Sequence, residues 1–294
     1  MWRNLGPLAS SEPPARALSP TVRGILWMLV ASTFFALMGA AGKAAAAELP
    51  AIEVAFFRSF LSFLLIAACA GAQRWDLRVG DRPRMALRAL AGTVSLVAYF
   101  WALSVMPLAE ALLLAHTSPI FTALFAWWLL GEKPTRRSVA GLVLALVGVA
   151  LLLRPGTAVF GAGGAVALLG AASAGLAYTQ VRTLKEEPTW GIVFWFMLVA
   201  WAATLPAMAP TFVMPTHPGI WAALAGAGFT ATLAQGAMTR SYRLAPAGTA
   251  SIASLGTVLV ATVIGVVAFG EVPGPATWAG GVLILAGTWV AASR

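Results

Sequence analysis

Ten apolar segments alternate with short polar segments along the chain, and most are long enough for a helix to cross a bilayer. Single strands cannot satisfy their backbone hydrogen bonds in lipid, so we expect these segments to be helices. The predicted helices cover residues 24–42, 52–71, 85–105, 108–130, 138–153, 163–184, 190–209, 219–243, 246–269 and 277–292. The pattern therefore predicts an all-α integral membrane protein with ten transmembrane helices, preceded by a disordered cytoplasmic tail at residues 1–22.

A short phrase, Gly-Glu-x-Pro, occurs twice, beginning at Gly131 and again at Gly270, 139 residues later. One unit of five helices is therefore used twice, and we expect a first repeat at residues 23–155 and a second at residues 156–294. Other residues match at the same spacing without a gap, namely Pro107 with Pro246, Ala111 with Ala250, Gly141 with Gly280 and Gly148 with Gly287.

Basic residues are distributed unevenly between the two sides of the membrane that this helix pattern defines. Sixteen Lys and Arg residues fall in the tail, the even-numbered loops and the C-terminus, whereas the odd-numbered loops hold only Lys43 and Arg154, and Arg58 lies within a helix. An excess of positive charge marks the cytoplasmic side, so both termini are expected there. Since each repeat has five helices, the second must enter the membrane from the opposite side, which predicts an inverted repeat.

Composition agrees with a membrane protein, because 60% of the residues are hydrophobic, 10% are charged and the mean hydropathy is +0.86. The net charge of +9 comes from short loops between apolar segments, so the expected partner is the lipid bilayer and not nucleic acid. The single cysteine, Cys69, excludes an internal disulfide, and no Cys/His cluster has metal-ligand spacing. No P-loop, HExxH or GxSxG motif occurs, so we expect no cofactor, no metal and no enzymatic activity.

Four stretches of the first repeat resemble a known family. The segments that begin at Pro107, Thr117, Leu130 and Ala140 read PLAEA, TSPI, LGEKP and AGLVLALVG, and together they resemble the EamA domain of the drug/metabolite transporter (DMT) superfamily. The second repeat is a weaker version of the same pattern. The resemblance implies two inverted five-helix halves around a cavity, and movement of a small metabolite by alternating access.

The expected function is therefore secondary active transport of a small organic metabolite, such as an amino acid, a vitamin or a nucleoside-like molecule, across the bacterial inner membrane. The first helix contains no acidic residue, so the Glu with which related small multidrug exporters exchange protons for cationic drugs has no counterpart here. A zwitterionic or anionic substrate is expected instead. A multidrug exporter, a channel and a membrane-embedded enzyme remain the alternatives, and the sequence leaves a homodimer open.

Arg58 lies about six residues into the second predicted helix, where a charge is costly unless it is paired or wet. It is a candidate clamp for a carboxylate or phosphate of the substrate. The alternatives are an internal ion pair with Glu53 or Glu110, or a side chain that reaches outward to the membrane surface.

The fourth helix carries two titratable residues, Glu110 and His116, which are candidates for coupling transport to a proton gradient. Alternatively, Glu110 is an N-terminal helix charge and His116 a hydrogen-bonded packing residue. Pro119 follows closely and predicts a kink.

Several larger side chains within the helices are further candidates for substrate binding. Tyr99, Trp101 and Tyr178 could stack on a flat substrate. Polar residues also recur on one face of the eighth helix at spacings of three and four, which indicates either a wet pathway or close helix packing. The candidate substrate-binding residues are Arg58, Tyr99, Trp101, His116, Tyr178, Gln180, Gln235 and Thr239, and the stripe on the eighth helix is Gly228, Thr232, Gln235, Thr239 and Tyr242.

The two Gly-Glu-x-Pro phrases are interpreted as structural turns rather than coupling sites. The glycine can end a helix in the left-handed conformation, the proline can start the next helix, and the glutamate can favour that helix through its dipole. The residues concerned are Gly131, Glu132 and Pro134, and their copies Gly270, Glu271 and Pro273.

Overall fold

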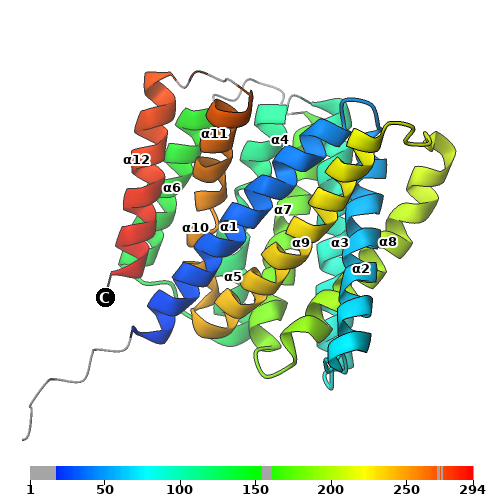
Figure 1. Ribbon diagram of the computed structural model, residues 1–294. Coiled ribbons are helices and arrows are strands. Elements are labelled where there is room, and N and C mark those ends of the chain that lie inside the picture. Colours follow the sequence, from blue (N-terminus) through cyan, green and yellow to red (C-terminus); the bar gives the residue numbers. More distant parts are fainter. Residues whose placement is uncertain (1–17, 107, 154–160, 270–271, 273, 294) are drawn as a thin grey trace, which may run out of the picture.

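The protein is a bundle of α-helices, seen from the side in Figure 1. The structure is a computed structural model that describes residues 18–106, 108–153, 161–269, 272 and 274–293. These residues form only helices and connecting segments, with no strand among them. The helices are α1 (Pro20–Ala45), α2 (Ala51–Gln73), α3 (Arg82–Val105), α4 (Leu108–Ala115), α5 (Ser118–Leu130), α6 (Arg136–Leu153), α7 (Ala162–Thr183), α8 (Thr189–Met208), the short 3-10 helix η2 (Ala209–Thr211), α9 (Pro218–Leu244), α10 (Ala247–Ala253), α11 (Gly256–Phe269) and α12 (Pro275–Ala292).

The predicted fold class is confirmed, since this part of the chain is helical in ten segments when α4 with α5 and α10 with α11 are each taken together. Nine of the ten are long and apolar enough to cross a membrane. The segment outside that set is α9, which carries glycine, threonine and glutamine on its buried face where other helices carry aliphatic side chains. These polar residues of α9 therefore face the interior of the bundle.

Two of the predicted helices are broken near the middle, one between α4 and α5 and the other between α10 and α11. Thr117 Oγ1 donates to the Leu114 carbonyl oxygen over 2.6 Å, and Ser254 Oγ donates to the Ser251 carbonyl oxygen over the same distance. Each hydroxyl satisfies a carbonyl that the break releases. Pro119 lies in the first turn of α5, where a missing N–H is tolerated, so the kink expected there is a complete break.

Helix ends recur at the spacing of the sequence repeat. Both ends of α12 lie 139 residues after the ends of α6, and α10 begins 139 residues after α4. The packing of helices recurs as well, since α1 lies along α9 while α7, the segment one repeat later than α1, lies along α3. These helix ends and helix neighbours therefore recur along the described chain at about the spacing of the repeated phrase.

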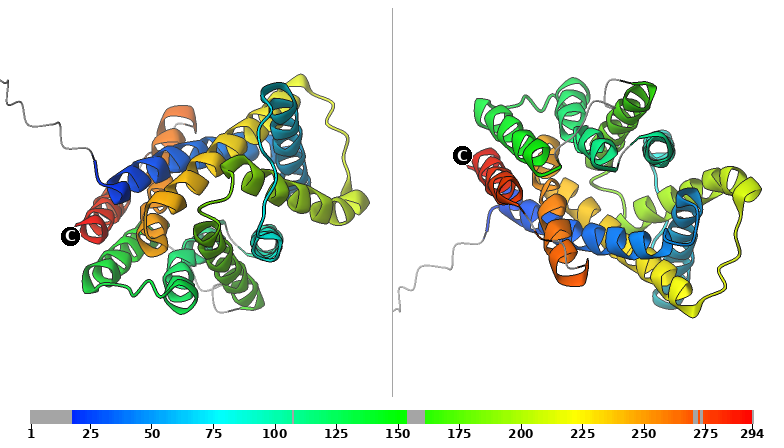
Figure 2. Two further views of the ribbon diagram at one scale, coloured as in Figure 1. Left: turned by 90° about the horizontal axis from the view of Figure 1, so that it is seen from below. Right: turned by 90° about the horizontal axis from the view of Figure 1, so that it is seen from above.

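Figure 2 looks along the bundle and shows α6 and α12 at one edge and α2 and α8 at the other, with α1, α3, α7 and α9 between them. The described chain begins and ends on the same side of the bundle, at the bottom of Figure 1, and Ser19 and Ser293 line one cavity there. We call this side the termini end. Charged loops with Arg78, Lys133 and Lys185 also lie at this end.

The contact between α6 and α12 explains why glycines repeat in the sequence. A Cβ atom at Gly148 would lie 2.6 Å from the carbonyl oxygen of Gly280, and one at Gly141 would lie 2.5 Å from the carbonyl oxygen of Gly287. The helices are thus antiparallel and in backbone contact, which only residues without a side chain allow. The glycines that match between the two copies are the ones that meet each other.

We expect Gly148→Ala to lower the thermal unfolding midpoint of the purified protein, because the new methyl group would overlap the backbone of α12. Overpacking of this kind costs about 1–3 kcal/mol, which outweighs the gain of about 1 kcal/mol from alanine in a helix. Gly39→Ala is the matched control, since a Cβ there has no atom within 4 Å. An equal or higher midpoint for Gly148→Ala than for Gly39→Ala would contradict the close contact.

Candidate functional site

The buried face of α9 gathers polar side chains. All five members of the predicted stripe, Gly228, Thr232, Gln235, Thr239 and Tyr242, are buried in the bundle. Gly228 meets α2, since Ser62 Oγ donates to its carbonyl oxygen over 2.8 Å. Close packing against α2 therefore explains Gly228 in this stripe. Gln235 and Tyr242, farther along α9, instead interact with the charged side chain of Arg88.

Arg88 on α3 is the most deeply buried cation of the described chain, with 2% of its surface exposed. Its Nη2 donates to Gln235 Oε1 on α9 over 3.3 Å, and its guanidinium lies over the ring of Phe196 on α8, 4.2 Å from the centroid. The group also interacts electrostatically with Tyr178 and Tyr242. Gly92, one turn away, leaves the space that this side chain fills, because a Cβ there would collide with Arg88 and Phe196.

The charge count grouped Arg88 with the cations of the loops, although the predicted helix at residues 85–105 includes it, and the structure places it inside α3. α3 begins at Arg82, with Asp81 Oδ1 accepting from the Arg84 N–H at the N-cap. Arg88 therefore lies almost two turns inside the helix. An N-cap aspartate followed by a proline in the first turn is a helix-start signal, so the sequence indicates that this helix begins well before Arg88.

Arg58 on α2 is partly buried near the opposite end of the bundle. Its Nη1 lies 3.0 Å from the sulfur of Met38 on α1, which is a weak acceptor, and its Nε is buried without a hydrogen-bond partner. The predicted internal pair with Glu53 does not form, because Glu53 Oε2 accepts from the backbone N–H of Val213 over 3.0 Å. Within the described residues, Arg58 forms no ion pair with any carboxylate.

Tyr178 on α7 interacts electrostatically with both arginines, and its ring stacks on Tyr242 with centroids 5.6 Å apart and planes 17° apart. Tyr99 on α3 interacts with Arg58. The Tyr242 hydroxyl and the Thr239 hydroxyl on α9 are buried without a hydrogen-bond partner. These contacts define what we call the arginine–tyrosine cluster: Arg58, Arg88, Tyr99, Tyr178, Gln235 and Tyr242.

The cluster holds two positive charges, and neither forms an ion pair with a carboxylate of the described chain. Removing an ion from water costs several kcal/mol unless a counter-charge or hydrogen bonds replace the lost hydration. Phe196, Gln235 and the tyrosine hydroxyls supply only partial replacement. The arrangement is chemically suited to bind an anionic group, which would accept from the unused guanidinium N–H groups.

Four of the eight predicted substrate-binding residues lie outside this cluster, namely Trp101, His116, Gln180 and Thr239. Trp101 is 44% exposed, on the face of α3 that also exposes Leu90, Val94 and Val97. Residues at this spacing form a lipid-facing stripe, so the structure does not bring Trp101 toward Tyr99. Gln180 on α7 is buried and accepts from Thr183 Oγ1 over 3.1 Å.

The two proton-coupling candidates lie on α4 and at its end. His116 stands at the break between α4 and α5 with its Nδ1 2.7 Å from the Leu112 carbonyl oxygen, and this contact fits the hydrogen-bonded packing role. Glu110 lies in the first turn of α4 and is 4% exposed. Neither residue contacts the arginine–tyrosine cluster through any described hydrogen bond.

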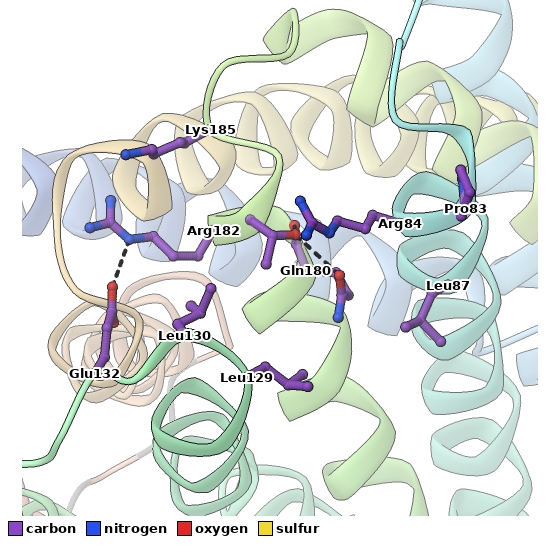
Figure 3. Close-up of a pocket in the computed structure, with 10 residues that line it drawn as sticks. Pro83, Arg84, Leu87, Leu129, Leu130, Glu132, Gln180, Arg182 and Lys185 are labelled. Carbon is purple, nitrogen blue, oxygen red and sulfur yellow. Dashed lines mark hydrogen bonds and ion pairs between the residues drawn. The ribbon is translucent and has the colours of Figure 1, made fainter.

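A cavity of about 540 Å³ opens at the termini end, and Figure 3 shows the side chains that line it. Leu87 of α3 and Gln180 of α7 line it. Arg84, Arg182 and Lys185 make its wall basic. The cavity thus has a positively charged mouth to which α3 and α7 both contribute.

Glu132 and Arg182 join three parts of the chain at this mouth. Arg182 Nε donates to Glu132 Oε1 over 3.0 Å, and Arg182 Nη1 donates to the carbonyl oxygens of Tyr242 and Arg243 over 3.1 and 2.8 Å. Glu132 Oε2 accepts from the Ala247 N–H over 2.8 Å. Glu132 therefore caps α10, a helix of the other half of the chain, and not the helix α6 that follows it.

The first Gly-Glu-x-Pro turn connects α5 to α6. Gly131 has φ +69° and ends α5, as a left-handed glycine should, while α6 begins at Arg136, two residues after Pro134. The second turn, with Gly270, Glu271 and Pro273, lies outside the described residues.

Comparisons with known proteins agree with a transport function. The model of the EamA-like transporter family matches residues 22–154 and again residues 161–293. The pseudopaline exporter CntI of Pseudomonas aeruginosa is 33% identical over 264 residues, which cover 89% of this chain and 93% of the exporter. The riboflavin transporter of Vibrio cholerae is 25% identical, over 90% of this chain and 91% of the transporter. A solved crystal structure with a TM-score of 0.79 and 21% identity covers 92% of this chain and 96% of its own, and shares the fold.

We expect Arg58→Met to stabilise the ligand-free protein. Replacing a buried ionic group with an apolar side chain of similar length removes its desolvation penalty, and such replacements have stabilised proteins by about 1–4 kcal/mol. The measurement is the unfolding free energy in detergent without added ligand. Arg78→Met, in an exposed loop, is the control and should change stability by less than about 0.5 kcal/mol. A clear loss of stability in Arg58→Met would mean that a group of the protein already neutralises Arg58.

Proposed function

The chain belongs to the EamA-like transporter family, and we propose that it is a secondary transporter that carries a small organic metabolite with an acidic group across the bacterial inner membrane by alternating access. The observation that carries this proposal is a buried site with two cations that no described carboxylate neutralises, built from both halves of the chain. The proposed halves are residues 23–155 and 156–294.

The contact between α6 and α12 supports an inverted relation between these halves. A shift of 139 residues turns Gly141 into Gly280 and Gly148 into Gly287, so it converts the contact of Gly141 with Gly287 into that of Gly280 with Gly148. A two-fold axis that exchanges two antiparallel helices in this way is perpendicular to them. For helices that cross a bilayer, such an axis lies in the membrane plane, as inverted-repeat transporters require.

The placement of the cluster between the halves supports alternating access. Arg58, Arg88 and Tyr99 belong to the first half, whereas Tyr178 and Tyr242 belong to the second. A ligand in the cluster would contact both halves at once. Rocking of one half against the other would then expose the ligand to one side of the membrane and afterwards to the other.

The nature of the substrate follows from the charge of the cluster. Guanidinium groups bind carboxylates or phosphates through paired N–H groups, and the membrane interior strengthens this preference because water is excluded. The names of the relatives, a pseudopaline exporter and a riboflavin transporter, describe organic molecules of small size, in accord with this class.

The orientation that we propose places the termini end in the cytoplasm. Lys and Arg gather in the loops of this end, and cytoplasmic loops carry an excess of these residues. The cavity of about 540 Å³ with Arg84, Arg182 and Lys185 would then open to the cytoplasm and attract anions from that side.

Arg58→Lys should weaken substrate affinity at least about tenfold, because an ammonium cannot make the two parallel hydrogen bonds of a guanidinium, and bonds to charged groups are worth about 1.5–3 kcal/mol. The substrate is first found by thermal shift against a metabolite panel. Affinity is then the half-saturating concentration for counterflow of labelled against unlabelled substrate in liposomes.

Arg78→Lys serves as the control for this experiment and should leave affinity unchanged. An unaltered half-saturating concentration in Arg58→Lys would exclude Arg58 from the substrate site. Flux without saturation would indicate a channel, and chemical change of the substrate would indicate an enzyme.

The inverted topology predicts opposite labelling of two engineered cysteines in a Cys69→Ala background. A cysteine at Arg136 should react with a membrane-impermeant thiol reagent only from the cytoplasm, and one at Val272, which is 93% exposed, only from outside intact cells. Both positions lie at equivalent ends of the two repeats, so parallel repeats would put them on one side. Labelling of both from the same side would refute the inversion.

A further inference from the structure

We propose that the substrate carries two separate anionic groups, one held by Arg58 and the other by Arg88, with Tyr178 between them. This inference rests on the proposed transport function and specifies the class of molecule that the same site takes. It follows from the positions of the two arginines, their neighbours and their unused donors.

The two guanidinium groups occupy different levels of the bundle. Tyr99, which interacts with Arg58, lies on α3 seven residues after Gly92, and the Arg88 guanidinium lies beside Gly92. At 1.5 Å per residue this places the two levels ~10 Å apart along the helix. Tyr178 interacts electrostatically with both arginines.

Each arginine has a separate set of neighbours. Arg58 lies against Met38 of α1, whereas Arg88 lies between Phe196 of α8 and Gln235 of α9. The two sets come from different helices. Each set can therefore hold one anionic group without the other arginine, which makes two subsites and not one shared site.

Both subsites keep donors free for a ligand. The Nε of Arg58 and the Nε of Arg88 are buried without a hydrogen-bond partner, and the contact of Arg88 with Gln235 is long for a charged donor. A carboxylate can accept from Nε and the neighbouring amino group of one guanidinium together. Near Arg88, the unpartnered hydroxyl of Tyr242 adds a further donor.

Charge balance decides between one and two anionic groups. A ligand with a single negative charge would neutralise one arginine and leave the other buried without a counter-charge. A ligand with two separated negative charges neutralises both, so burial of the complete site favours it. The stacked rings of Tyr178 and Tyr242 offer an apolar surface for the part of the molecule that joins the two groups.

The test compares straight-chain dicarboxylates of four to seven carbons with monocarboxylates of the same carbon number. Their dissociation constants are measured from the thermal shift of the detergent-purified, full-length protein. We expect at least one dicarboxylate to bind about tenfold or more tightly than its monocarboxylate, the ratio that one extra charged contact gives. Arg58→Gln and Arg88→Gln should each reduce this ratio to about one.

Arg78→Gln removes the same charge from an exposed loop and should keep the full preference. Arg58→Lys, which keeps the charge, should retain part of it. If Arg88→Gln fails to fold, Arg58→Gln alone decides, because the one hydrogen bond described for Arg58 is its weak contact with Met38. Equal binding of dicarboxylates and monocarboxylates by the unaltered protein, or a preference that survives both changes, would overturn the inference.

The two proposals can fail separately. Saturable counterflow of a monoanion that depends on Arg58 but not on Arg88 would overturn the two-anion inference and leave the carrier function standing. A clear preference for dicarboxylates in binding, together with no counterflow of any ligand, would support the two subsites and overturn the carrier function.

Discussion

Charge buried in an apolar bundle without a counter-charge is the constraint on which the rest of this structure depends. Arg58 and Arg88 lie inside helices that are otherwise suited to lipid, and within the described chain no carboxylate pairs with either. Aromatic faces, a glutamine and tyrosine hydroxyls surround them. Such surroundings reduce the cost of burial but do not cancel it. A site of this kind is most stable when an anion occupies it, and this links the energetics of the fold to the choice of ligand.

The bundle is packed tightly at its two edges, on either side of the polar cluster. At one edge, glycines of α6 and α12 bring two backbones into contact. At the other edge, Trp201 of α8 meets Phe60 of α2 edge to face, with centroids 5.6 Å apart. Both edges join the first half of the chain to the second through apolar or small residues. The polar groups of the arginine–tyrosine cluster lie between these edges, where a ligand can bind without breaking either edge.

The sequence was sufficient for features that depend on lipid or on repetition. Apolar length predicted the helical segments, and the glycines that recur at the repeat spacing are the ones that form the α6–α12 contact. Gly131 was identifiable because a left-handed helix end favours glycine. Such features follow from local rules or from a fixed spacing along the chain.

Features that depend on tertiary contacts were harder to predict. Arg88 was counted with the cations of the loops although it falls within the predicted helix at residues 85–105, and only its contacts with Gln235 and Phe196, distant in sequence, show that it lies inside the bundle. Trp101 lies on the lipid-facing stripe, a position that its size did not reveal. Glu132 caps a helix more than a hundred residues away. In each case the partner, and not the residue type, determines the role.

Tyr242 connects the centre of the bundle with the termini end. Its ring stacks on Tyr178 in the cluster, while its backbone carbonyl accepts from Arg182, which in turn binds Glu132. Ring and carbonyl belong to one residue near the end of α9, so a shift of α9 that moves the ring also moves the acceptor of Arg182. The pair of Glu132 and Arg182 is partly exposed, and a pair of this kind contributes only about 0–1 kcal/mol by itself. The pair therefore stabilises the mouth of the cavity mainly through its hydrogen bonds to three backbone groups, the carbonyls of Tyr242 and Arg243 and the N–H of Ala247. A rearrangement of the cluster would displace these backbone groups.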